Sequence, residues 1–492
     1  MLFCELLRFE RVIWSDGGGN VTVGGLSPDS RSCQYGTLFF CIRGAWKNGH
    51  DFAGDAYARG CRHFVAEHPL PLPSDASVLV CSSPRRKMAI LAARYYGDPA
   101  KDMRVIGITG TKGKTTTAQM LRGILEGHGV PTAYMGTSGV EFAGEHIATE
   151  HTTPPSTDLF RYLRMIRDRG IKTVVMELSS QALAYDRAYG LPVYIGVFTN
   201  LSRDHIGYGE HESMTAYRAA KMRLFTEFAP KEVVLNAEDS FSTDILRVRA
   251  GEACRLYGNG DGSTLRYRGV RYHKNRDRLC TSFLLAGGGV SREVTIDFAG
   301  EHYILDLLAA LSAASLAEGV PWETLLTGAG RISVPGRCET FFAENGAMLV
   351  IDYAHNGASL AAALRGLRPY ASGRLLCLFG AVGDRARCRR ADMAAAAERY
   401  ADFSVITTDN PGNEDVSEII GEIQAAFSDS SRFCAIPDRT EAIRYLLRVS
   451  RKGDVVLFAG KGDEKYQLLL GKKVPFSERE IIKNSAFSQK QK

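Results

Sequence analysis

Short apolar runs rich in β-branched residues recur along the chain, and each leads through a polar or glycine turn into a segment with helical spacing. The runs stand at 105–108, 173–176, 195–198, 349–351, 375–379, 405–406 and 455–458. Strands that are apolar on both faces and alternate with helices are typical of parallel sheets in α/β proteins. The pattern therefore predicts an α/β chain whose ligands bind beside the polar residues at the carboxyl ends of the strands.

Changes along the 492 residues divide this pattern into three domains, within the two to four that roughly 100–200 residues per domain would give. Residues 1–101 form a mixed N-terminal domain. Residues 102–332 form a central domain of parallel strands, which begins with a glycine loop and carries a more β-like insertion around 254–299. The Val-Pro-Gly-Arg segment 334–337 marks a break, and residues 333–492 form a C-terminal, Rossmann-like domain.

Composition and charge exclude several classes of protein. Hydrophobic residues make up 45% and charged residues 24%, as in folded globular domains rather than disordered chains. The 61 Lys and Arg residues exceed the 55 Asp and Glu residues only slightly and form no basic stripe, so no nucleic-acid partner is expected. The 11 cysteines form no C-x-x-C pair, which favours reduced thiols in a cytoplasmic protein. No signal peptide and no apolar run of about 18 residues are recognised, so we expect no membrane insertion.

The strongest local signal is a glycine loop between an apolar run and a helical segment. Residues 110–116 read GTKGKTT. Backbone N–H groups of such a loop hold phosphates, Lys114 neutralises them, and the hydroxyl of Thr115 ligates Mg²⁺. The strict motif would have a glycine at the position of Ile108, so an ordinary glycine turn stays open as the alternative.

Further positions carry candidate chemistry, each with a plainer alternative. Glu177 ends an apolar run, where a carboxylate either supports Mg²⁺ or is simply solvated. Asp204 and His205 follow another run, and such a histidine is either a metal ligand or an ordinary polar residue. Lys221 shares a helical face with apolar Leu224, so its amine points inward and tends to lose its proton, unless the side chain reaches water.

A series of short segments carries a resemblance to a known family. The segments are Thr109–Thr116, Thr152–Pro154, Glu177–Ser180, Phe198–Leu201, Ala219–Lys221, Val334–Arg337, Asp352–Asn356, Asp409–Pro411 and Gly460–Gly462, with Asp29–Arg31 before them. In this order they resemble the Mur ligases, and in particular the members that add the third residue of the peptidoglycan stem peptide. The resemblance spans nearly the whole chain.

The resemblance implies a three-domain, ATP-dependent peptide ligase of cell-wall synthesis that acts as a cytoplasmic monomer. ATP would phosphorylate the D-Glu γ-carboxylate of UDP-MurNAc-L-Ala-D-Glu, giving an acyl phosphate. The amine of a free diamino acid would then attack, and the tetrahedral intermediate would expel phosphate. The implied cofactors are ATP and Mg²⁺. The UDP end, ATP and the amino acid would bind the first, second and third domains, so that domain closure completes the site.

The same resemblance assigns residues to each part of this reaction. The catalytic residues are Lys114, Glu177, His205 and Lys221, and the metal ligands are Thr115, Glu177, His205 and Lys221, the last as an N-carboxylated lysine. The ATP site consists of Gly110, Thr111, Gly113, Lys114, Thr115, Thr116, Asn200, Arg337, Asp352 and His355. The muramoyl-dipeptide site consists of Ser30, Thr152, Thr153, Ser179 and Arg187. The amino-acid site consists of Arg390, Asp409, Asn410, Pro411, Gly412, Gly460 and Glu464.

The chain departs from the family pattern at several of these places. Gln181 stands where a His usually follows the Ser-Ser pair. Tyr303 and Asp306 replace two Asn residues that lie near the adenine, which affects nucleotide preference or affinity. Gly412 stands where ligases of meso-diaminopimelate have an Arg, and Asp463 replaces a His.

The departures at the amino-acid site predict its preference. A charge-assisted hydrogen bond to a carboxylate contributes roughly 1.5–3 kcal/mol, so the missing Arg should weaken selection of diaminopimelate about ten-fold or more. Acidic residues of neighbouring loops favour an amine-terminated side chain if these loops converge. They are Asp409, Glu414, Asp415, Asp463 and Glu464. The expected substrate is L-lysine or a similar diamino acid, unless Arg389 or Arg390 supplies the carboxylate contact.

Two other functions stay open. A folylpolyglutamate synthetase-like ligase of the same superfamily shares a segment like Asp352–Asn356, but the Thr run at 115–117, the Thr-Thr-Pro at 152–154 and the full N-terminal domain argue against it. A catalytically degenerate relative would bind nucleotide or muropeptide without ligating them. The departures at Gln181 and at the two Asn positions favour this second alternative.

Overall fold

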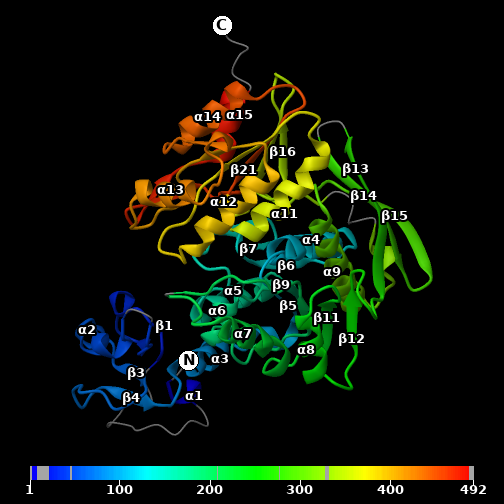
Figure 1. Ribbon diagram of the computed structural model, residues 1–492. Coiled ribbons are helices and arrows are strands. Elements are labelled where there is room, and N and C mark those ends of the chain that lie inside the picture. The colour runs from blue at the N-terminus through cyan, green and yellow to red at the C-terminus, as the bar shows by residue number, and fades with distance from the viewer. Residues whose placement is uncertain are drawn as a thin grey trace.

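The computed structural model describes residues 3–7, 22–44, 47–207, 209–275, 278–326 and 332–486. Three larger sheets follow one another along the chain, and helices pack on their faces (Figure 1). The α/β fold with parallel sheets is confirmed. The domain limits expected after residues 101 and 332 stay a prediction. In the part of the chain that the structure describes, no helix is both long and apolar enough to cross a membrane.

The first sheet has four parallel strands in the order β1-β2-β3-β4. Alternate residues of β2 pack on opposite faces, as the two-residue period of a strand requires: Phe40 lies with Leu91 in one cluster, and Phe39 lies with Ala56 in the other. The elements are α1 (Phe3–Leu6), β1 (Gly25–Ser27), η2 (Ser30–Ser32), β2 (Thr37–Phe40), η3 (Gly49–Phe52), α2 (Ala53–Ala58), β3 (His63–Ala66), β4 (Ser77–Val80) and α3 (Pro84–Tyr95).

The second sheet has eleven strands in the order β15-β14-β13-β12-β11-β10-β5-β9-β6-β7-β8. Strands β12 to β6 in this order are parallel, and antiparallel hairpins extend both edges. The strands are β5 (Arg104–Thr109), β6 (Thr132–Gly136), β7 (Gly139–Phe142), β8 (Glu145–Ile147), β9 (Thr173–Glu177), β10 (Ile195–Phe198), β11 (Glu232–Asn236), β12 (Cys254–Tyr257), β13 (Leu265–Asn275), β14 (Arg278–Gly287) and β15 (Val290–Ile296). The β-like insertion expected around 254–299 is thus confirmed.

Helices α4 and α9 pack against each other beside this sheet (Figure 1). Helix α9 is apolar around most of its circumference because it is buried between α4 and strands β10 to β13. The connecting elements are η4 (Pro99–Asp102), α4 (Lys114–Gly127), α5 (Ser156–Asp168), α6 (Ser180–Ala184), α7 (Met214–Thr226), α8 (Phe241–Val248), α9 (Glu301–Glu318) and η5 (Trp322–Leu325).

The third sheet has six strands in the order β16-β17-β21-β18-β19-β20, parallel except for β16. One apolar cluster continues from α9 into this domain, and the Tyr370 hydroxyl donates to the Cys280 carbonyl of β14 at 2.9 Å. The elements are β16 (Glu339–Phe342), β17 (Met348–Asp352), α11 (Gly357–Leu367), η6 (Arg368–Tyr370), β18 (Leu375–Phe379), α12 (Cys388–Tyr400), β19 (Phe403–Ile406), α13 (Val416–Ala425), η7 (Ser430–Arg432), β20 (Phe433–Ala435), α14 (Arg439–Val449), β21 (Val455–Ala459), β22 (Tyr466–Leu469), β23 (Lys472–Pro475) and α15 (Glu478–Ala486).

Candidate functional site

The glycine loop lies between β5 and α4, in the strand–loop–helix context that its sequence predicts. Gly110 and Gly113 have φ angles of 153° and 81°, which glycine adopts without strain. The Lys114 ammonium curls back over the loop and donates to the carbonyls of Gly110 at 2.9 Å and Thr111 at 3.2 Å. The loop therefore presents a lysine and the N-terminus of a helix to one space, which suits phosphate.

A neighbouring strand end braces this loop. The Asn200 side chain accepts from the Lys112 amide at 2.9 Å and donates to the Lys112 carbonyl at 3.1 Å. The Thr199 hydroxyl donates to the same carbonyl at 2.6 Å. Asn200, expected at the ATP site, thus fixes the shape of the loop in this structure.

Glu177 is fully buried at the end of β9, where four donors reach its carboxylate. The Tyr134 hydroxyl donates to Oε1 at 2.6 Å, and the amide and hydroxyl of Thr137 donate at 3.0 and 3.1 Å. The Thr115 hydroxyl lies 3.1 Å from Oε2. A hydroxyl and a carboxylate beside a phosphate loop are the oxygen ligands that Mg²⁺ prefers, so these residues fit the ion.

Lys221 points inward from α7, as its helical face predicts, and its side chain is 1% exposed. Its ammonium donates to the Gly110 carbonyl at 2.7 Å and lies 4.5 Å from the centre of the Tyr217 ring. Burial, followed by the nearby Lys114, lowers the pKa of Lys221 well below its usual value. The inward direction of the side chain is confirmed, and the alternative in which it reaches water is wrong.

His205 approaches the same ring from another direction, with its ring centre 5.9 Å from that of Tyr217. Its Nδ1 atom shares a hydrogen bond with the Glu210 carboxylate at 2.9 Å. Burial lowers the pKa of His205, although Glu210 opposes this shift. Among the residues that the structure describes, no group of three or more His, Cys, Asp and Glu side chains has the arrangement of a metal site. The second metal pair, His205 with Lys221, stays a prediction.

Asp204 joins the central domain to the C-terminal domain. Its carboxylate accepts from Lys112 of the glycine loop at 2.9 Å, from the Asn356 side chain at 2.8 Å, and from Arg389 of α12. Burial opposes ionisation of this carboxyl, yet Lys112, His205 and Arg389 together hold its pKa well below the usual range. Burial in turn lowers the pKa of Lys112 to about 8. The sequence singled out Asp204 as a candidate site residue, but it did not indicate which side chains would pair with it.

Glu210 forms a second link between the same domains. Its buried carboxylate lies 2.7 Å from Arg385 and 3.5 Å from Arg389, both in the C-terminal domain, while it also holds His205. Sequence reasoning missed Glu210 as a site residue. The available signal was its position between β10 and α7, close after the Asp-His pair.

Residues expected to hold the muramoyl-dipeptide gather at the end of β9. The Thr153 hydroxyl donates to the Glu177 carbonyl at 2.8 Å and accepts from the Ser179 amide at 3.0 Å. Arg187 donates to the Thr153 carbonyl at 2.9 Å, and the Thr152 hydroxyl lies 3.1 Å from that of Thr137. Ser30 stands apart from this group, in η2 of the first domain.

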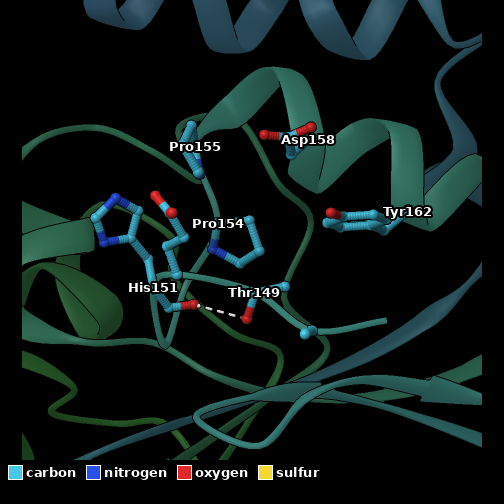
Figure 2. A pocket seen from close by; sticks show the side chains of 8 residues that line it. Thr149, His151, Pro154, Pro155, Asp158 and Tyr162 are labelled. Atoms are coloured by element: carbon cyan, nitrogen blue, oxygen red, sulfur yellow. Dashed lines mark hydrogen bonds between the residues drawn. The ribbon is translucent and has the colours of Figure 1, made fainter. Parts of the chain in front are cut away.

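A pocket of about 240 Å³ opens beside this group, between the segment after β8 and helix α5. Figure 2 shows Asp158 and Tyr162 on the helix and His151 on the facing loop, where the Thr149 hydroxyl donates to the His151 carbonyl at 3.2 Å. Its lining residues are Ala148, Thr149, Glu150, His151, Pro154, Pro155, Asp158 and Tyr162. The pocket directly adjoins Thr152 and Thr153 in the chain, so it offers room next to the expected dipeptide site.

Of the residues expected at the nucleotide from the third domain, Asp352 contacts α9, and Arg337 and His355 both lie against Tyr353. The Asp352 carboxylate accepts from the Tyr303 hydroxyl at 2.9 Å, across the two domains. The Arg337 guanidinium lies 4.4 Å from the centre of the Tyr353 ring. Burial, followed by the charge of a nearby lysine, lowers the pKa of His355 well below its usual value. Tyr303 therefore ties the two domains together here.

Part of the expected acidic cluster forms at the amino-acid site. Glu464 accepts from the Lys461 ammonium at 2.6 Å and from Asn410 at 3.0 Å, and Asp409 lies 3.8 Å from that ammonium. Burial raises the pKa of Asp409, whose Oδ2 atom is buried without a hydrogen-bond partner. Asp415 caps α13 instead, because its carboxylate accepts from the amide two residues later.

The arginines near this site have other partners. Arg390 is 2% exposed and pairs with Glu414 at 2.6 Å and with Glu422 at 2.7 Å. Arg389 pairs with the carboxylates of Asp204 and Glu210 in the central domain. Gly412 has a φ of 62°, and a Cβ atom there would overlap the Asp384 carboxylate. Neither arginine is therefore free in this structure to receive a ligand carboxylate.

Comparison with known proteins identifies the family. The Mur ligase middle domain matches residues 108–314, and the glutamate ligase domain of the Mur ligases matches residues 336–462. The UDP-N-acetylmuramoyl-L-alanyl-D-glutamate--2,6-diaminopimelate ligase of Geobacillus kaustophilus is 37% identical over 494 residues, covering 98% of this chain and 99% of that protein. This chain belongs to the Mur ligase family.

Other Mur ligases agree over the full length. The ligase of the same name from Syntrophomonas wolfei is 35% identical over 487 residues, covering 98% of both chains. A solved structure of a UDP-N-acetylmuramoyl-L-alanyl-D-glutamate--2,6-diaminopimelate ligase is 28% identical, with a TM-score of 0.69 and 99% of both chains covered. Mur ligases are ATP-dependent amide ligases of peptidoglycan synthesis, so this chain is an enzyme of that kind.

Proposed function

We propose that this Mur ligase joins a free diamino acid to UDP-MurNAc-L-Ala-D-Glu, with L-lysine or a similar diamino acid preferred over meso-diaminopimelate. ATP transfers its γ-phosphoryl group to the D-Glu γ-carboxylate and leaves as ADP. The α-amine of the amino acid then attacks the acyl phosphate, and inorganic phosphate leaves as the amide forms. The dipeptide substrate is supported by the names of relatives that cover 98% of the chain, including its N-terminal domain. That coverage also favours this reaction over a folylpolyglutamate synthetase-like one.

The phosphate loop performs the first step by positioning and charge neutralisation. The Lys114 ammonium, which now donates to two loop carbonyls, would instead hold the β- and γ-phosphates of ATP. Thr115 and Glu177 would hold Mg²⁺, which neutralises phosphate charge as the γ-phosphoryl group moves. The four donors that surround Glu177 keep its carboxylate in one orientation.

Lys221 and the polar residues after β9 serve the acceptor substrate. The buried amine of Lys221 is suited to carboxylation, because carbon dioxide adds only to the neutral amine and burial favours that form. Thr152 and Thr153 lie in the chain between lining residues of the pocket, and Arg187 donates to the Thr153 carbonyl, so these three residues would bind the muramoyl-dipeptide.

One observation supports the amino-acid preference: in the part of the chain that the structure describes, Arg389 and Arg390 are both already paired and neither is free for a distal carboxylate. Gly412 leaves no side chain at the position, and Asp384 fills the space that a Cβ atom would enter. Arg390 is committed to Glu414 and Glu422, and removing it from these pairs would leave buried charge uncompensated. Glu464 is 19% exposed and pairs with Lys461 at 2.6 Å, so an incoming ammonium group would share this carboxylate with Lys461.

The test is an amino-acid panel with UDP-MurNAc-L-Ala-D-Glu, ATP and Mg²⁺, read by mass spectrometry of the tripeptide product and by phosphate release. We expect product with L-lysine or L-ornithine at a kcat/KM at least about ten-fold above that with meso-diaminopimelate. L-norleucine is the matched control, because it keeps the carbon chain of lysine without the terminal amine. A strong preference for meso-diaminopimelate, or equal use of norleucine and lysine, would overturn the proposed selectivity.

A further inference from the structure

A buried carboxyl group lies directly beneath the phosphate loop. Asp306 projects from α9 and is 6% exposed. A Cβ atom at Gly113 would overlap its Oδ1 atom and lie 3.2 Å from its Cγ atom. The Thr117 hydroxyl, itself fully buried in α4, lies 3.2 Å from the same oxygen. The carboxyl group therefore packs against the residue that caps the phosphate-binding end of α4.

Because Asp306 lies next to the N-terminus of α4, its charge affects how a nucleotide phosphate binds there. The N-terminus of α4 attracts anions through its free amides and its dipole. An ionised Asp306 and a bound phosphate are like charges that compete for the same helix end. A neutral carboxylic acid leaves that helix end to the phosphate.

We propose that Asp306 is a neutral carboxylic acid built into the floor of the phosphate loop, and that ATP and ADP bind the form in which it holds its proton. Asp306 is then a positioning residue that sets nucleotide affinity through Gly113, in addition to the lysine of the loop. By linkage, bound phosphate strengthens the hold of Asp306 on its proton to the same degree.

The surroundings agree with a neutral group. Burial raises the pKa of Asp306 to about 8, although the Thr117 hydroxyl and Arg337 both lower it. Tyr257 of β12 also faces Asp306 and brings no positive charge, and burial raises the pKa of Tyr257 well above its usual value, so it stays neutral. Asp306 is therefore neutral below about pH 8 and ionises as the pH rises through that value.

Calorimetric titration with ADP in magnesium buffer between pH 6.5 and 9 tests the proposal. If nucleotide binds only the neutral form, its affinity falls about ten-fold between pH 7 and pH 9, because about one tenth of the protein remains competent. Lys112, with a pKa of about 8, adds its own loss over this range. The Asp306→Asn variant isolates the contribution of Asp306. Between pH 7 and pH 9 its loss of ADP affinity should be smaller than that of the wild type by a factor of about ten. Glu301→Gln, an exposed carboxylate on the same helix, is the matched control and should keep the wild-type profile.

A second variant keeps the test decisive if Asp306→Asn does not fold. Thr117→Val removes the hydroxyl that stabilises the ionised carboxylate, so the fall in ADP affinity should move to higher pH. The proposal would be overturned if the ADP affinities of the wild type and Asp306→Asn changed with pH in parallel. It would also be overturned if Asp306→Asn bound ADP more tightly than the wild type by the same factor at every pH. An unshifted profile for Thr117→Val would also overturn it. Since ADP binding is the readout, these outcomes are independent of the amino acid that the enzyme uses.

Discussion

Replacing Glu210 by Gln would weaken the contact between the central and C-terminal domains. Glu210 lies on the loop between β10 and α7, and its side chain is 1% exposed. Across the joint its carboxylate lies 2.7 Å from Arg385 and 3.5 Å from Arg389, and within its own domain it holds His205 at 2.9 Å. Glutamine keeps the shape and one acceptor oxygen but removes the charge. The variant therefore changes the electrostatics of the joint with little change in packing.

The magnitude follows from the two contacts across the joint, with Arg385 and Arg389. A hydrogen bond to a charged group contributes about 1.5–3 kcal/mol and a neutral one about 0.5–1.5 kcal/mol, so each contact loses about 1 kcal/mol. The Arg385 side chain is 41% exposed, and solvent screening reduces its share. The closed arrangement is then less stable by about 1.5 kcal/mol, which corresponds to roughly a ten-fold change in equilibrium.

Steady-state kinetics with all three substrates measure this effect, and small-angle X-ray scattering follows the population of open molecules. We expect kcat/KM to fall about ten-fold in Glu210→Gln and about two-fold in Arg385→Gln, which removes only the half-exposed contact across the joint. The control is Glu318→Gln, which breaks a pair with Arg104 at 2.7 Å inside the central domain and should leave kcat/KM unchanged. Wild-type kinetics and scattering for Glu210→Gln would refute the reasoning.

Three further substitutions test other parts of the structure. Lys114→Met should abolish phosphate release, because the phosphates lose their ammonium partner; release at the wild-type rate would contradict that role. Tyr303→Phe removes one donor from Asp352 and should lower the free energy of unfolding in urea by about 1–3 kcal/mol, so an unchanged midpoint would argue against it. Glu478→Gln leaves the fully buried Arg439 without its counter-charge and should cost about 3–5 kcal/mol in the same assay, whereas a loss below about 1 kcal/mol would show that the pair is not needed.

Local pattern accounts for much of what was predicted correctly. The apolar runs form strands because a parallel strand that is buried on both faces needs apolar residues at every position. This signal lies in consecutive residues, so it can be recognised from the sequence. The inward direction of Lys221 followed from the helical period, since Leu224 lies on the same buried face. The glycine loop was recognisable because its chemistry lies within seven consecutive residues.

Partners from distant segments were beyond such reasoning. The acidic cluster at the amino-acid site was expected to include Asp415 and Glu414, but Asp415 caps a helix and Glu414 pairs with Arg390. Several donors in other loops could pair with each of these carboxylates. Which donor does so depends on the loops that folding brings together. Glu210 is the clearest case, because its arginine partners lie about 175 residues further along the chain.

The sequence by itself determined the α/β class, the phosphate loop, the inward lysine and the order of motifs that places the chain among the Mur ligases. These properties depend on short-range period and on the types of residue in each motif. Only the tertiary structure decided that Asp204 and Glu210 tie two domains together, that the arginines near Gly412 are already paired, and that Asp306 lies beneath Gly113. The reason is physical: the charge state and role of a buried polar group depend on the distance to its partners, and folding alone sets that distance.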